Sequence, residues 1–370
     1  LDFNLSISFM IDVNSKVLLI YTGGTIGMVE NPETRTLESF NFEHLKSHFP
    51  EMQRLQFQVD HMVFDPVIDS SDISPEHWKK MVRIIDDNYD DYDGFVILHG
   101  TDTMASTASA QSFMIENLTK PLILTGAQVP IGKLRTDSKE NLITALEIAA
   151  DKDVLGYPIV PEVCIFFQNY LLRGNRTAKI NADNFNAFRS FNYPYLAKSG
   201  IRINYDKNSI LKVNFDKKTR FHYRLNSHIA VLKMFPGIAQ STVETILNIE
   251  GVRAVVIETY GTGNAPLTPW FLEAIRNAIK KGVIIVNVTQ CVIGSVDMNR
   301  YETGVELLKA GVIGGEDSTI EAVVTKLMVL LGHDYDRDEV SVRMRVPLVG
   351  EITRPEDKIN ERISVSPLLH

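Results

Sequence analysis

Short runs of wholly apolar residues alternate along the chain with longer segments in which apolar positions recur every three or four residues. The first runs are KVLLIYT from Lys16, GFVILHG from Gly94, LILTGAQ from Leu122 and EVCIFF from Glu162. A strand that is apolar on both sides belongs to a parallel sheet with helices on both faces. The sequence therefore predicts an α/β fold with a larger N-terminal sheet of parallel type flanked by helices.

Two helices are predicted between these runs. The segment TMASTASAQSFMIENL, residues 103–118, repeats small and apolar residues at helical spacing and stops before Pro121. The segment DSKENLITALEIAAD, residues 137–151, predicts another helix with Asp137 or Ser138 as its N-cap. The first of these helices lies between the apolar runs that begin at Gly94 and Leu122, so the two strands and this helix make a βαβ unit.

The pattern changes in the second half of the chain. Residues 191–226 lack sustained periodicity, and we interpret them as a linker. A second alternating block follows with HIAVLKMF, AVVIETY and VIIVNVTQC as its apolar runs. We therefore expect an N-terminal domain over residues 16–190 and a smaller C-terminal α/β domain over residues 227–370.

Composition narrows the class of protein. The chain has 370 residues, of which 44% are hydrophobic and 23% charged, and this length favours two domains in a globular protein. The formal net charge of -8 leaves no broad basic surface for a nucleic acid backbone, so a small-molecule ligand is favoured. The two cysteines, Cys164 and Cys291, form no CxxC pair, which indicates neither a disulfide framework nor a zinc site and fits a reducing, cytoplasmic location.

No apolar stretch approaches the roughly 20 residues of a membrane-spanning helix. The first ten residues lack a basic region and a signal-peptide cleavage site, so we interpret them as an extension, with Met10 as an alternative natural start.

Two turns after predicted strands carry candidate chemistry. Residues 22–27, TGGTIG, follow the first strand, and residues 99–103, HGTDT, follow the second. Ligands of open parallel sheets bind beyond the carboxyl ends of the strands, and paired glycines let a backbone approach a ligand closely. Threonine or aspartate in such a turn is more often a helix cap, but two hydroxyl-rich turns on neighbouring strands together favour a polar ligand site.

Other site motifs fail on detail. TGGTIG lacks the GxGxxG order, and GAQVPIGK, residues 126–133, has neither the spacing nor the following Ser or Thr of a P-loop. His44 and His48 are separated by four positions but lack the glutamate of HExxH, so a solvated helix face is favoured over zinc. The acidic run DDNYDDYD, residues 86–93, lacks EF-hand spacing and is interpreted as an exposed helix end. No metal site is expected.

Four motifs in order make the chain recognisable: YTGGTIG at 21–27, DSSD at 69–72, HGTDTM at 99–104 and RGNRTAK at 173–179. The chain resembles the L-asparaginases, and most nearly the cytoplasmic type I bacterial enzymes. The likeness runs from about Lys16 to Thr353 and includes TYGTGNAP, NVTQC and AGVIGG in the second domain. The resemblance implies hydrolysis of L-asparagine to L-aspartate and ammonia through a threonine-linked acyl-enzyme intermediate, without a cofactor.

The resemblance also implies the site residues. Thr25 matches the nucleophile, and Thr101, Asp102 and Lys179 match the other catalytic residues of the family. Asp69, Ser70 and Ser71 match the segment that holds the substrate's α-carboxylate and amino group, which Thr101 and Asp102 also help to bind. An alcohol is a weak nucleophile at neutral pH, so Thr25 needs a base such as Lys179, reached through Thr101, with Asp102 anchoring the lysine. Whether Thr25 or Thr101 attacks first is open, and we favour Thr25.

The resemblance extends to assembly and regulation. Asn264 matches a residue that approaches a neighbouring subunit's site, which implies a homo-oligomer, as a dimer or a homotetramer. Glu258 stands where members with an activating second asparagine site carry an arginine, so activation is not expected here. Cys291 matches a residue near that second site and is equally interpreted as a buried core cysteine. The family's tyrosine in the lid after TGGTIG is absent, and Arg35 occupies the position reached by counting from Thr25.

Two alternatives stay open at this stage. One is an asparaginase-like subunit of a tRNA amidotransferase, which the acidic balance disfavours. The other is an amino-acid sensor without turnover, which the joint presence of Thr25, Thr101, Asp102 and Lys179 disfavours.

Overall fold

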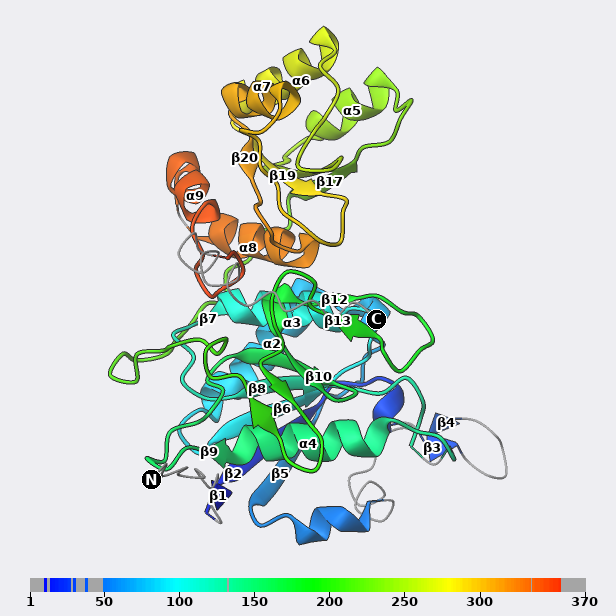
Figure 1. The fold of residues 1–370 in the computed structure, drawn as a ribbon, viewed down its shortest axis with the longest axis vertical. Helices are drawn as coiled ribbons and strands as arrows, with labels where there is room; N and C mark the ends of the chain where they lie inside the picture. Colours follow the sequence, from blue (N-terminus) through cyan, green and yellow to red (C-terminus); the bar gives the residue numbers. More distant parts are fainter. Residues whose placement is uncertain are drawn as a thin grey trace, which may run out of the picture. The chain divides into compact units, whose positions relative to one another are not determined.

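The computed structural model describes residues 10–11, 14–27, 29–30, 37–38, 49–131, 133–333 and 335–353. They form two compact units (Figure 1). The first unit runs to Ser190 and also contains Pro194–Tyr223. The second contains Phe191–Tyr193 and resumes at Arg224.

The first unit is built on an eight-stranded sheet in the order β15-β14-β11-β10-β8-β6-β2-β5. Neighbours within β10-β8-β6-β2-β5 are parallel, whereas β11, β14 and β15 add antiparallel strands at one edge. The strands are β2 (Lys16–Tyr21), β5 (Gln58–Val63), β6 (Gly94–Leu98), β8 (Leu122–Thr125), β10 (Val163–Phe167), β11 (Tyr170–Arg173), β14 (Ala197–Lys198) and β15 (Asn204–Tyr205). The predicted α/β class is confirmed, and the sheet as a whole is mixed.

Helices cover both faces of this sheet. In Figure 1, α2 (Pro75–Asp87) and α3 (Met104–Met114) lie on one side of the strands and α4 (Ser138–Ala150) on the other. The helix α2 buries one stripe, with Trp78, Met81, Val82 and Ile85 at helical spacing. Nearly all of α3 is buried, because its alanines, serines and threonines allow close packing on several sides.

Short strand pairs complete the first unit. They are β1 (Met10–Ile11) with β9 (Asp151–Lys152), β3 (Val29–Glu30) with β4 (Leu37–Glu38), β7 (Ile115–Glu116) with β16 (Arg220–Phe221), and β12 (Ala178–Lys179) with β13 (Phe188–Arg189). Residues 194–223, within the segment expected as a linker, thus contribute β14, β15 and β16 to the first unit. Strands of two residues are too short to produce a periodic pattern.

The second unit holds a four-stranded parallel sheet, β17-β18-β19-β20. Alternate residues of β18 point to opposite faces: Val255 and Ile257 join one core cluster, and Ala254 and Val256 join another. The first cluster includes residues of α5, α6 and α7, and the second includes residues of α8 and α9. The elements are β17 (Ile229–Lys233), β18 (Ala254–Thr259), β19 (Ile284–Thr289), β20 (Ile313–Gly314), α5 (Gln240–Leu247), α6 (Pro269–Lys280), α7 (Glu302–Ala310), α8 (Ile320–Gly332) and α9 (Arg337–Met344). The predicted smaller α/β domain is confirmed.

Candidate active site

The turns that the sequence analysis identified meet at the carboxyl edge of the first sheet. Because β2 pairs in parallel with both β5 and β6, their carboxyl ends lie side by side. The N–H of Thr22 donates to the carbonyl of Leu98 at 3.0 Å, and the N–H of Ile68 donates to the carbonyl of Thr22 at 2.8 Å. The segments after these three strands are therefore hydrogen-bonded to one another where they leave the sheet.

Glycines allow these segments to touch. Gly24 has φ +91°, and a Cβ there would lie 2.6 Å from the Cα of Gly100. A Cβ on Gly100 would lie 2.5 Å from the Oγ of Ser70. Real Cβ atoms do not approach other atoms so closely, so the backbones before Thr25 and Thr101 and the side chain of Ser70 occupy a space that only glycine permits.

Lys179 joins the turn that carries Thr101 and Asp102. Its Nζ lies 2.9 Å from the Oγ1 of Thr101 and 2.7 Å from the Oδ1 of Asp102. Lys179 lies in β12, which follows the 3-10 turn Gly174–Arg176, and that turn is buried. Lys179 thus forms one hydrogen-bonded set with two adjacent residues that are 78 and 77 positions away in the sequence, and it is the donor to both.

Gln128 is a member of this set that the sequence analysis missed. Thr101 donates its hydroxyl proton to the Oε1 of Gln128 at 3.0 Å, and the Nε2 of Gln128 donates to the carbonyls of Ala182 and Asn184 at 3.2 and 3.0 Å. Gln128 follows β8, the next strand along the sheet from β6. The rule that ligands bind at carboxyl ends could have identified it, since it is a polar residue just after an apolar run.

The DSSD segment forms the 3-10 turn η3 (Ser70–Asp72), with Asp69 at its N-cap. The Oδ1 of Asp69 accepts hydrogen bonds from the N–H and the hydroxyl of Ser71, both at 2.8 Å, and these bonds lower the pKa of the Asp69 carboxyl. Ser70 is buried, and its carbonyl accepts the hydroxyl of Thr103 at 2.6 Å. Ser70 therefore lies against the HGTDT turn, and its neighbours Asp69 and Ser71 are exposed.

A buried histidine orients the peptide before Thr101. The Nδ1 of His99 lies 2.6 Å from the carbonyl oxygen of Gly100, so this nitrogen must carry the proton. Its Nε2 accepts from Thr107 at 3.0 Å, and Thr107 accepts from the indole N–H of Trp78 at 3.0 Å. Burial lowers the pKa of His99 to about 4, which keeps the ring neutral at pH 7.

The peptide that His99 holds has its other end at the site. A carbonyl and the following N–H point in opposite directions, so fixing the Gly100 carbonyl also fixes the N–H of Thr101. Within the described residues, the N–H groups of Thr101 and Asp102 donate to no protein acceptor. Both are free to bind a ligand oxygen.

Three further residues from the sequence analysis lie in the second unit. The Oδ1 of Asn264 accepts the hydroxyl of Thr303 at 2.6 Å, in the loop after β18. Glu258 is half-buried at the end of β18, 3.9 Å from the ammonium of the exposed Lys233. Cys291 is exposed, so its interpretation as a buried core cysteine is wrong.

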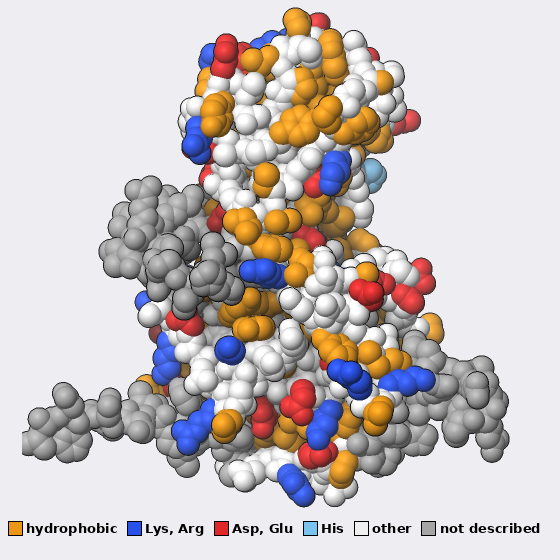
Figure 2. All heavy atoms as spheres, turned by 45° about the vertical axis from the view of Figure 1, so that its right-hand side comes forward, with side chains coloured by type: hydrophobic (Ala, Val, Ile, Leu, Met, Phe, Trp, Pro, Cys, Tyr) orange, Lys and Arg blue, Asp and Glu red, His pale blue; other side chains and the backbone are white. Residues whose placement is uncertain are grey.

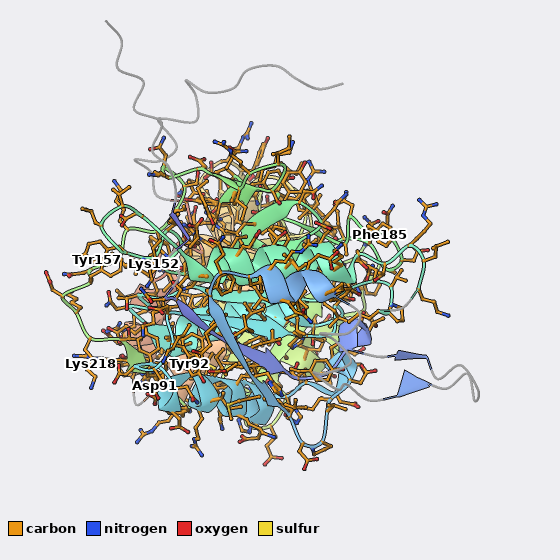
Figure 3. All side chains as sticks on the ribbon, turned by 90° about the horizontal axis from the view of Figure 1, so that it is seen from below. Asp91, Tyr92, Lys152, Tyr157, Phe185 and Lys218 are labelled. Carbon is orange, nitrogen blue, oxygen red and sulfur yellow. The ribbon has the colours of Figure 1, made fainter. Side chains whose placement is uncertain are left out.

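Other sequence candidates have separate outcomes. Arg35 and the pair His44 and His48 lie outside the described residues. The acidic run, residues 86–93, spans the end of α2, and its Asp93 pairs with Lys152 at 3.1 Å. In Figure 3, Asp91 and Tyr92 lie at the opposite side of the first unit from Phe185, which belongs to the loop that Gln128 contacts.

The described ranges lack two other features that would point to a different class of protein. They contain no group of three or more His, Cys, Asp or Glu residues that could hold a metal ion. None of their helices is long and apolar enough to cross a membrane. On the face seen in Figure 2, basic and acidic side chains are interspersed on the described surface.

Comparison with known proteins covers both units. Residues 16–211 match the family model of the asparaginase N-terminal domain, and residues 228–344 match that of the glutaminase/asparaginase C-terminal domain. The chain is 43% identical to L-asparaginase 1 of Escherichia coli K12 over 344 residues, covering 92% of this chain and 98% of that protein.

Two further similarities were found. The 60 kDa lysophospholipase of Mus musculus is 39% identical over 92% of this chain and 63% of its own length. The crystal structure of L-asparaginase I from Vibrio cholerae matches with a TM-score of 0.83 and 41% identity, covering 92% of this chain and all of that one. Family models match both units, and the 43% identity to L-asparaginase 1 extends over nearly the full length of both chains. The chain therefore belongs to the asparaginase family.

Proposed function

We propose that this protein hydrolyses the side-chain amide of L-asparagine to L-aspartate and ammonia, as an amidohydrolase acting on linear amides. Family membership and 43% identity to an L-asparaginase over nearly the full length support this activity. The observation that carries the chemical assignment is the hydrogen-bonded set of Lys179, Thr101 and Asp102 beside the glycine turn that bears Thr25.

Thr25 is the nucleophile in this proposal. Its Oγ attacks the amide carbon, the C–N bond breaks, and ammonia leaves with a proton from the relay. The resulting ester on Thr25 is hydrolysed by water, which releases aspartate and returns the proton to the threonine. The preference for Thr25 over Thr101 as first nucleophile is supported by the position of Thr101, whose hydroxyl is already bonded to Lys179 and Gln128.

Lys179 is the base, and Thr101 connects it to the reacting atoms. In the structure Lys179 donates to Thr101, and Thr101 donates to Gln128, so the chain of hydrogen bonds runs away from the lysine. Proton uptake by Lys179 requires a neutral amine and a reversed Thr101 hydroxyl. Asp102 anchors the lysine in reach of Thr101.

The substrate's charged groups have matching partners. The α-ammonium is bound by the carboxylates of Asp102 and Asp69, and the α-carboxylate by the hydroxyls of Ser70 and Ser71, with Thr101 alongside. The N–H groups of Thr101 and Asp102 stabilise the oxyanion that forms when Thr25 attacks, an interaction typically worth about 10² to 10³ in rate. No cofactor enters this mechanism.

Assembly and location extend the proposal. Asn264 reaches the active site of a neighbouring subunit in a dimer or homotetramer, and the protein acts in the cytoplasm.

Glu258 prevents activation by a second asparagine, because its carboxylate repels that of the amino acid. Burial raises the pKa of Glu321, and the charge of Glu258 adds a smaller increase.

Ammonia release tests the function. We expect turnover of L-asparagine to exceed that of L-glutamine and D-asparagine, with hyperbolic saturation, and Thr25→Ala to abolish turnover while retaining asparagine binding. A sigmoidal curve would contradict the role given to Glu258. Binding without turnover by the unaltered protein would favour the amino-acid sensor, and neither that alternative nor the tRNA amidotransferase subunit is favoured by the family comparison.

A further inference from the structure

The N-terminal turn of α4 holds the segment after β8 by its side chains. The hydroxyls of Thr136 and Ser138 donate to the carbonyl of Val129 at 2.8 and 2.9 Å. The Nδ2 of Asn141 donates to the carbonyl of Gly126 at 3.0 Å. Backbone groups of residues 126–129 are thus satisfied by one helix turn.

Asp137 is the charged member of this arrangement. Its carboxylate accepts the N–H of Gln128 at 3.0 and 3.1 Å and the N–H of Val129 at 3.1 Å. It also accepts the Nδ2 of Asn141 at 3.2 Å. Asp137 occupies the predicted N-cap of α4, yet its side chain makes no capping bond to the helix. The carboxylate serves the preceding loop instead.

That loop presents Gln128 to the proposed relay. Gln128 accepts from Thr101 through Oε1, and its Nε2 is committed to the carbonyls of Ala182 and Asn184. The two carbonyls fix which end of the amide faces Thr101, because a flipped amide would place oxygen against oxygen. The backbone of Gln128 is held by Asp137, and its side chain is held by the loop after Lys179.

We propose that Asp137 is a positioning residue of the reaction and acts through Gln128. The inference rests on the proposed function. Asp137 fixes the backbone from which Gln128 reaches Thr101, and Gln128 holds the Thr101 side chain in place beside Lys179. A hydrogen bond to a charged acceptor is stronger than one between neutral groups, so the carboxylate sets this geometry more firmly than the neighbouring hydroxyls do.

A double-mutant cycle in the full-length protein tests this. We expect Asp137→Ala to lower kcat for L-asparagine about tenfold with KM changed less than about threefold, since a small misplacement of a relay group costs rate more than binding. In a Gln128→Ala background, Asp137→Ala is expected to lower kcat less than about twofold. Asp137→Asn keeps one acceptor oxygen and is expected to recover part of the loss.

Ser138→Ala is the matched control. It removes another hydrogen bond from the same helix turn to the same loop, but the carbonyl of Val129 keeps its bond from Thr136, so kcat is expected to be unchanged. Thermal unfolding of each variant separates misfolding from misplacement of Gln128. If Asp137→Ala does not fold, Asp137→Asn replaces it in the cycle.

The outcomes are distinct. Equal losses from the Asp137 substitution in both backgrounds, or a change confined to KM, overturn the inference alone. Absence of asparagine turnover by the unaltered protein overturns the proposed function and the inference with it.

Discussion

The ammonium of Lys179 lies 2.7 Å from the carboxylate of Asp102, and the two side chains are 17% and 65% exposed. The lysine is thus largely enclosed, whereas the aspartate faces solvent on its other side. A single carboxylate can hold the lysine and still be reached by an incoming ammonium group. This asymmetry agrees with the two roles proposed for Asp102.

Replacing Lys179 by methionine is expected to lower kcat by about 10² to 10⁴, because general-base assistance is lost while the length of the side chain is kept. The free energy of unfolding should change little, since Asp102 is exposed and the pair is screened by solvent. Ammonia release and chemical denaturation measure the two quantities. The control is Lys198→Met, which alters an exposed lysine over the ring of Tyr170, and full activity of Lys179→Met would disprove the role as base.

Gly24→Ala is expected to abolish activity. The new Cβ would meet the backbone of Gly100 at 2.6 Å, so the turn before Thr25 has to move away from Thr101. Gly156→Ala is the matched control, because Gly156 has a similar φ of +84° and nothing within 4 Å of the added Cβ. Gly156→Ala should lower the free energy of unfolding by about 1 kcal/mol and leave kcat unchanged. Equal activity of the two variants would show that the glycine contact is dispensable.

The lowered pKa of His99 predicts that the folded protein loses stability in acid. The unfolded side chain titrates near its ordinary pKa of 6.5 and the folded one near 4, so the unfolded chain binds more protons between these values. The free energy of unfolding therefore falls as the pH falls through this window, by about 3 kcal/mol in total. Burial raises the pKa values of Glu147 and Asp151, which act in the opposite direction.

The variant His99→Asn isolates the histidine term, since the carboxyl groups are the same in both proteins and the amide can still donate to Gly100. Urea unfolding at pH 7 and at pH 4.5 should give a smaller difference for His99→Asn than for the unaltered protein. Equal differences would mean that the titration of His99 does not contribute.

The buried ion pair of Arg173 and Glu162 should be costly to break. Their side chains are 3% and 2% exposed and 2.6 Å apart, and the carboxylate also accepts the N–H of Leu211 at 2.8 Å. Arg173→Met leaves this carboxylate unpaired and should cost about 3 to 5 kcal/mol of unfolding free energy. Adding Glu162→Gln should restore part of that loss, as measured by denaturant unfolding. A double variant less stable than Arg173→Met would contradict this account.

Much of the fold follows from apolar runs. The strands β2, β6, β8 and β10 and the helices α3 and α4 lie where the pattern predicts them, because burial on both sides of a strand leaves a clear signal. The strand β5 lies at the sheet edge with a mostly exposed pattern, and it left no such signal.

The site was predicted less completely. The position of the two glycine turns at strand ends indicated Thr25, Thr101 and Asp102, whereas DSSD and Lys179 came only from the family resemblance. A lysine near a two-residue strand has no local pattern, and its partners are 77 and 78 positions away. Asp137 is one of the two residues predicted as the N-cap of α4 and occupies that position, yet the contacts of its side chain depend on a loop that only the tertiary structure brings to it.

The chain enters the second unit for Phe191–Tyr193 and then returns to the first until Tyr223. Dissecting the protein at Ser190 would therefore remove β14 and β15 and strip β11 of its outer neighbour. The N–H and C=O groups of β11 would then be unpaired at the edge of the sheet, where they can pair with a strand of another molecule. A truncated N-terminal fragment intended for study in isolation should therefore extend to Tyr223, and one that ends at Ser190 is expected to aggregate.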